Sequence, residues 1–110
     1  MANVFKNAVS ASVGTSAVDV YTAPSSTTST VIGCTVSNRT GSTITIDAQI
    51  TDTSASATVY LVKAAPIATG SSLVLIGGDQ KVVLETTDKL TITSNTATSA
   101  DVIVSVLESS

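Results

Sequence analysis

The stretch that decides the fold is Thr43-Ile44-Thr45-Ile46-Asp47-Ala48-Gln49-Ile50, in which every even position is apolar and every odd position is polar. A period of two is typical of a strand with one buried face and one solvated face. The same rhythm recurs in residues 18–21 and 90–93. The predicted core therefore includes Ile44, Ile46, Ile50, Leu90 and Ile92, and the residues predicted to face outward are Thr43, Thr45, Thr91 and Thr93.

Turn-forming residues recur at short intervals along the rest of the chain, which predicts eight or nine short strands and no helix. The expected strands are 4–13, 17–22, 30–37, 43–51, 58–63, 72–76, 81–85, 90–94 and 101–107. A length of 110 residues suits one domain with one core. We therefore predict an all-β, single-domain antiparallel β-sandwich or jelly roll over residues 1–110. The strand count alone leaves jelly-roll and immunoglobulin-like topologies open.

Three local features carry further structural expectations. The even positions of the third strand, Ile32, Cys34 and Val36, are predicted to be buried, with the single cysteine acting as a small hydrophobic residue. Pro66 has no N–H to donate to a sheet, so it should mark an edge or a break. Residues 24–30 are rich in Ser and Thr and are expected to form a mobile loop.

The residues needed for common catalytic and metal chemistry are scarce. The chain has no His and one Cys, so it lacks the commonest general base and any cysteine-based zinc cluster. Its aspartates are expected mainly in turns, where Asp88 should cap backbone N–H groups. A Ca²⁺ site formed by Asp52 with Asp47 or a loop carbonyl is the alternative. We predict a protein that is not an enzyme and has no catalytic, cofactor-binding or metal-binding residues.

The net charge and the mean hydropathy indicate which kinds of molecule the protein could bind. The net charge is −3 and the five Lys and Arg residues are scattered, which argues against nucleic acid and anionic membranes as partners. The amino terminus shows no apolar run of signal-peptide length, so we expect synthesis in the host cytoplasm. The mean hydropathy is positive, which suggests apolar surface buried against another subunit. A homo-oligomer is therefore expected.

Three segments of the carboxy-terminal half, residues 65–73, 81–90 and 100–108, resemble small virion structural proteins of tailed bacteriophages. The resemblance covers roughly residues 36–108 and is a pattern of strands and turns. It implies a head decoration (cement) protein, located in the virion, that stabilises the capsid by bridging neighbouring capsid subunits. The major capsid protein or other virion proteins would be its partners. The alternatives are a neck or tail component, or a β-sandwich module that binds carbohydrate or another surface.

The expected contact elements are the amino-terminal strand, the loop after the second strand and the edge near the proline. Segment 1–9 is a possible extended contact arm. The candidate contact residues are Asn3, Val4, Phe5, Pro24, Ser25, Pro66 and Ile67.

Overall fold

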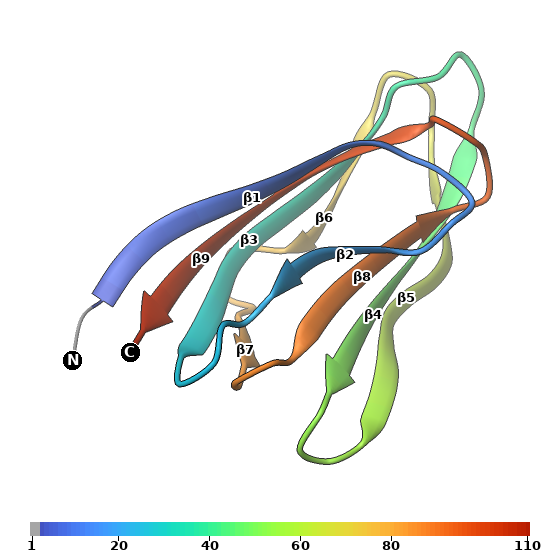
Figure 1. Cartoon of the computed structure of the whole chain (residues 1–110). Helices are drawn as coiled ribbons and strands as arrows, with labels where there is room; N and C mark the ends of the chain where they lie inside the picture. Colours follow the sequence, from blue (N-terminus) through green and yellow to red (C-terminus); the bar gives the residue numbers. More distant parts are fainter. Residues whose placement is uncertain (1–2) are drawn as a thin grey trace.

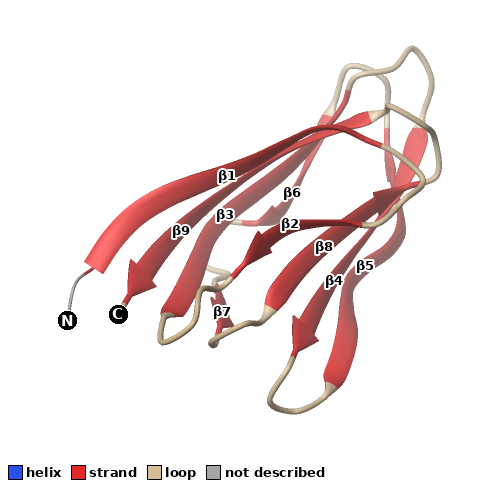
Figure 2. Ribbon diagram, in the orientation of Figure 1, coloured by secondary structure: helices blue, strands red, loops and turns tan. Residues whose placement is uncertain are grey.

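The chain forms two antiparallel sheets that pack face to face (Figure 1). The structure is a computed structural model and describes residues 3–110. Its nine strands are β1 (Asn3–Val13), β2 (Val18–Thr22), β3 (Thr28–Asn38), β4 (Ile44–Asp52), β5 (Ala57–Ile67), β6 (Ser72–Ile76), β7 (Val82–Leu84), β8 (Lys89–Ser94) and β9 (Ala100–Ser109). The described residues contain no helix, and so none that could cross a membrane (Figure 2). The all-β sandwich prediction is confirmed.

The order of the strands identifies the topology. Sheet A has the order β1-β9-β3-β6, with β7 also paired to β3, and sheet B has the order β2-β8-β4-β5. Strands β6 and β7 follow one another along the same edge of β3 and together fill one strand position. The pairs β1·β9, β2·β8, β3·β6/β7 and β4·β5 are thus nested, as in an antiparallel ribbon folded over itself. This pairing is that of a jelly roll rather than of an immunoglobulin-like sandwich.

The core between the sheets is aliphatic, as the sequence predicts. All five expected core residues of β4 and β8 are buried, and the four threonines expected on the opposite face are partly or fully exposed. Sheet A contributes Val31, Val36, Val104 and Val106, which are fully buried. Burial of these side chains from both sheets accounts for most of the stabilisation by the hydrophobic effect.

Strand β3 departs from the predicted alternation at one point. Val31 pairs with Val106 of β9, and Gly33 pairs with the next residue, Ser105, so Ile32 has no partner across the ladder. An extra residue of this kind is a β-bulge, and it shifts the following residues to the other face. Cys34 and Val36 are therefore buried as expected. The predicted burial of Ile32 is wrong, because the bulge leaves it half-buried on the outer face of sheet A.

The expectations for Pro66 and for residues 24–30 have different outcomes. Pro66 lies in β5, the outermost strand of sheet B, so the predicted edge is confirmed. The strand does not break there, because it continues to Ile67. The loop before β3 is shorter than expected, since β3 already begins at Thr28. Thr27 is buried, and its backbone N–H donates to Thr86 Oγ1 at 3.1 Å, which ties the end of this loop down.

Candidate interaction surface

The outer face of sheet A carries exposed apolar side chains in two rows that run across the strands. In the first row, Phe5 pairs with Leu107, Leu107 with Thr30, and Thr30 with Val83. In the second row, Val9 pairs with Ile103, Ile103 with Thr35, and Thr35 with Val74. The most exposed members are Phe5 (73%), Val9 (68%), Val74 (63%), Val83 (58%) and Ile103 (47%). We call this surface the apolar face.

The outer face of sheet B is different in chemistry. Asp47, Gln49 and Thr51 of β4 alternate there with the buried residues of the same strand. Lys63 Nζ lies 3.2 Å from Asp47 Oδ2, and Lys89 Nζ lies 3.7 Å from Asp19 Oδ2. This polar, ion-paired surface is typical of the solvated side of an antiparallel sheet. The apolar face of sheet A is therefore an exception within the same molecule, and large exposed apolar surfaces mark interaction sites.

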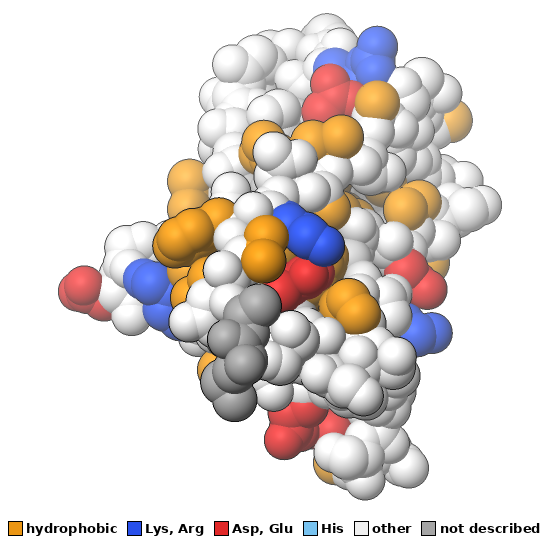
Figure 3. Space-filling view, turned by 60° about the vertical axis from the view of Figure 1, so that its left-hand side comes forward, with side chains coloured by type: hydrophobic (Ala, Val, Ile, Leu, Met, Phe, Trp, Pro, Cys, Tyr) orange, Lys and Arg blue, Asp and Glu red, His pale blue; other side chains and the backbone are white. Residues whose placement is uncertain are grey.

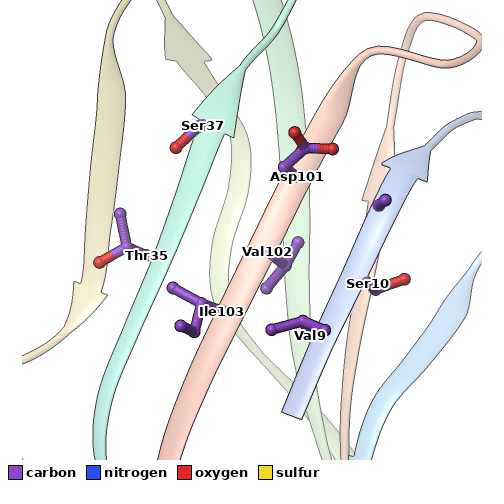
Figure 4. A pocket seen from close by; sticks show the side chains of 8 residues that line it. Val9, Ser10, Thr35, Ser37, Asp101, Val102 and Ile103 are labelled. Atoms are coloured by element: carbon purple, nitrogen blue, oxygen red, sulfur yellow. The ribbon is translucent and has the colours of Figure 1, made fainter. Parts of the chain in front are cut away.

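A hollow of about 310 Å³ lies on the apolar face, where three adjacent strands contribute side chains (Figure 4). Val9 comes from β1, Ile103 from β9 and Thr35 from β3. Asp101 borders the same hollow and is held by Arg39, whose Nη1 lies 3.2 Å from Asp101 Oδ1. The two rows themselves contain no charged residue.

Hydrophobic side chains also gather on the side of the molecule that β1 borders (Figure 3). Val4 is exposed there beside Lys6, whose ammonium lies 3.1 Å from Glu108 Oε1. The residues of β1 from Asn3 to Asn7 are all exposed, so both faces of the strand are open to solvent there. The apolar face thus continues to a free strand edge.

The structure separates the contact residues predicted from the sequence into two groups. Asn3, Val4 and Phe5 are exposed on β1, and they lie at the same end of the sandwich as the exposed Pro24 and Ser25. From Asn3 onward the expected arm is paired with β9, and residues 1 and 2 lie outside the described residues.

Pro66 and Ile67 lie at the opposite end of the sandwich, on sheet B. Pro66 is exposed there and stays a candidate. Ile67 pairs with the core residue Ile44 and is buried, so its assignment as a contact residue is wrong. The strand alternation turns its side chain inward.

Sequence reasoning did not single out the apolar face itself, although a signal for it exists. The sheet A strands contain unbroken apolar runs, such as residues 73–76, 82–84 and 102–104. Such runs place apolar side chains on both faces of a strand, whereas the strict alternation in residues 43–50 leaves one face polar. Their outward-facing members are Val74, Val83 and Ile103.

Tyr21 links the two sheets at the end of the sandwich where β1 begins. Its hydroxyl donates to Glu108 Oε2 at 2.5 Å and is also 2.7 Å from Ser29 Oγ. Burial and the hydrogen bond to Glu108 raise the pKa of Tyr21 to about 12. The same hydrogen bond lowers the pKa of the Glu108 carboxyl. Since β2 belongs to sheet B and the two partners to sheet A, this contact is a structural clamp.

The Tyr21 clamp predicts a pH dependence at alkaline pH. The folded-state pKa of Tyr21 is raised, so its contribution to stability is complete below the ordinary pKa of 10 and is lost as the pH rises through about 12. Tyr21→Phe should therefore lower the free energy of unfolding at neutral pH by about 1–2 kcal/mol. A spectrophotometric titration should show a tyrosinate transition near pH 12 in the natural protein. Persistence of that transition in Tyr21→Phe would assign it to another group.

The described residues contain one cluster of carboxylates, formed by Asp52, Glu85 and Asp88. Asp88 Oδ1 accepts the N–H of Thr53 at 2.9 Å, and its Oδ2 accepts the N–H of Glu85 at 3.0 Å. Asp52 accepts the N–H of Ala55 at 3.1 Å. These contacts confirm the predicted role of Asp88 in capping backbone N–H groups. The carboxylate oxygens accept hydrogen bonds from backbone N–H groups in the turns, and this explains the cluster more simply than a metal ion does.

The calcium alternative combined Asp52 with Asp47 or with a loop carbonyl, and the structure does not place Asp47 in the carboxylate cluster of Asp52. Asp47 Oδ1 accepts the N–H of Ala64 at 2.8 Å, and that hydrogen bond, followed by the contact with Lys63, lowers the pKa of Asp47. It belongs to the polar face of sheet B, away from the cluster of Asp52.

Removal of divalent cations should leave the melting temperature unchanged. The reason is that the carboxylates of the cluster already accept backbone N–H groups, so folding does not need an ion to neutralise them. Differential scanning calorimetry before and after dialysis against EDTA measures this. A drop of several degrees that Ca²⁺ restores would contradict the prediction and support the calcium alternative.

The single cysteine is buried, and the exposed aromatic rings lie apart from each other. Burial raises the pKa of the Cys34 thiol to about 12, so it stays protonated and unreactive at neutral pH. The exposed rings of Phe5 and Tyr60 belong to different sheets, and Lys63 Nζ lies 5.1 Å from the centre of the Tyr60 ring. They form no common platform on which a sugar could stack. No protein-family model and no curated protein matches the chain.

Proposed function

We propose that this chain is a non-enzymatic structural protein of a bacteriophage particle, which decorates the assembled capsid and stabilises it by bridging neighbouring capsid subunits. The observation that carries the proposal is the apolar face of sheet A, which presents uncharged side chains in two ordered rows. The resemblance of residues 36–108 to virion structural proteins supports the choice of partner. The major capsid protein is the partner that the proposal names.

The mechanism is passive. A protein bound across the boundary between two capsid subunits adds contacts that must break before the subunits separate. A site that spans two subunits exists only after assembly, so weak contacts to each subunit act together. The protein should accordingly bind assembled shells much more tightly than free subunits. Because the apolar face holds no charged side chain in its rows, binding should persist at high salt concentration.

Replacing Val83 by aspartate tests the apolar face directly. The substitution places a carboxylate in a contact that excludes water, so binding to shells assembled without this protein should weaken at least tenfold. The matched control is Val59→Asp, because Val59 and Val83 are both 58% exposed on edge strands, but Val59 belongs to sheet B. Cosedimentation with shells measures the affinity. Equal binding of both variants would remove the apolar face from the mechanism.

Microscopy of the particle distinguishes the proposal from its alternatives. Many copies distributed over the shell are expected for a decoration protein, and shells that lack it should rupture at lower temperature. A single ring of copies at one vertex would instead identify a neck or tail component. Absence from the particle would leave the surface-binding module as the remaining alternative.

A further inference from the structure

The free edge of β1 is the second unusual feature of sheet A. β1 ends the strand order of its sheet, so the backbone groups on one side of the strand have no partner in the described chain. It is 11 residues long, and its register with β9 is regular from Asn3 to Ser10. A long regular edge of this kind can accept another strand through backbone hydrogen bonds.

The other three edges carry features that oppose strand addition. β2 has only five residues and its register shifts between Asp19 and Tyr21. β5 contains Pro66 and the charged Lys63, with two irregularities in its pairing with β4. The β6/β7 edge is interrupted between Ile76 and Val82. Proteins use such features to prevent edge-to-edge association. From Asn3 to Ser10, β1 has none of them apart from Lys6, and its own register shift lies beyond that stretch, between Ser10 and Val13.

We infer that β1 pairs antiparallel with β1 of a second copy about a two-fold axis at Asn7, which joins the two A sheets into one continuous sheet. Asn7 is the middle of residues 3–11, which is the described part of β1 before the backbone turns at Ser12, where φ is 59°. In this register Phe5 lies opposite Val9 of the second copy. Lys6 lies opposite Ala8 of the second copy, so no like charges meet.

Neighbouring registers are less favourable. An axis at Lys6 would place the two lysines directly opposite each other, and like charges in that position destabilise a strand pair. The axis at Asn7 instead creates an apolar pair between Phe5 and Val9, which are on the outer face of β1. Through this pair the first apolar row of one copy continues into the second apolar row of the other.

The area of the apolar face indicates why a dimer would bind a capsid shell better than one copy, and this step rests on the proposed function. Four strand positions about 4.8 Å apart and nine residues of about 3.4 Å give one face of roughly 600 Å². A stable interface buries about 800 Å² on each partner. One copy alone falls below that value, whereas two joined copies present roughly 1,200 Å². The dimer is thus the form that offers a surface large enough to hold a capsid shell.

Engineered cysteines test the dimer in solution, without any shell. In the inferred pairing, the two copies of an Asn7→Cys variant place their thiols side by side, and mild oxidation should convert most of the protein to a covalent dimer. Ser105→Cys is the matched control, because Ser105 pairs with Asn7 but lies on β9. Its two copies would be three strand spacings apart, about 14 Å, which is too far for a disulfide. Native Cys34 is buried and does not compete.

The expected result is a covalent dimer for Asn7→Cys, none for Ser105→Cys, and a dimer of the unmodified protein in sedimentation at micromolar concentration. Equal cross-linking of both variants, or of neither, would overturn the inferred pairing, as would a monomer in sedimentation. Because no shell is present, these outcomes are independent of the Val83→Asp test. A dimer that fails to bind shells would refute the proposed function alone.

Discussion

Replacing Ile46 by alanine should lower the free energy of unfolding by about 2–5 kcal/mol. Ile46 is 1% exposed and lies in β4, which pairs with β8 on one side and β5 on the other. Its neighbours are held by both ladders and cannot collapse into the space that the truncation leaves. The cost therefore combines lost burial with a persistent cavity. Urea denaturation followed by circular dichroism gives the change, provided that the slope of the transition is unaltered.

Two control variants show whether the loss of stability depends on the size of the cavity and on the burial of the truncated isoleucine. Ile46→Val removes one methyl(ene) group and should cost about 0.5–1.5 kcal/mol. Ile103→Ala makes the same truncation on the apolar face, where the side chain is 47% exposed, and should cost much less. If Ile46→Ala unfolded at the same urea concentration as the natural protein, the inward assignment of this strand face would be wrong.

The fold could be predicted well where only one face of a strand is buried. In β4 and β8, apolar and polar residues alternate, so the sequence identifies both the strand and its inward face. Turn residues then set most strand boundaries; for example, Gly78 adopts a φ of 59° in the turn that ends β6. These signals are local, and for that reason they can be read from one sequence.

The less predictable features depend on contacts between distant residues. The bulge at Ile32 is defined by the register of β3 against β9, whose paired residues lie more than sixty positions further along the chain. The extension of β5 through Pro66 depends on Thr45, its partner in β4. Neither register has a signature within its own strand, so a local reading shortens β5 and turns Ile32 inward.

The candidate surface was predictable only in part, for a related reason. Phe5 could be named as a contact because it is a large apolar residue near the start of the chain, and the structure places it on an edge strand. Val83 and Val74 lie far apart from it in the sequence, and only the nested pairing of the jelly roll brings them onto the same face. The apolar face is therefore a property of the topology rather than of any one segment.

The cluster around Asp88 connects three loops at one end of the sandwich, and this determines what its loss should do. The carboxylate binds Thr53 of the β4–β5 loop and Glu85 of the segment after β7. The backbone carbonyl of Asp88 accepts the N–H of Ala23, at the end of β2, at 2.9 Å. Asp88 is 3% exposed and its two hydrogen bonds to backbone N–H groups are part-buried, so water replaces the lost acceptor only incompletely.

Asp88→Ala should accordingly lower the free energy of unfolding by about 2–4 kcal/mol, because it removes two part-buried, charge-assisted hydrogen bonds to backbone N–H groups. Asp79→Ala is the matched control, since Asp79 is also a turn aspartate but is exposed, and it should change stability by less than about 0.5 kcal/mol. Both values follow from urea denaturation. Asp88 is buried and is not a member of the apolar face, so Asp88→Ala that remains folded at low temperature should still bind shells. Loss of shell binding by this folded variant, with unfolding unaffected, would instead assign Asp88 to the contact with the capsid.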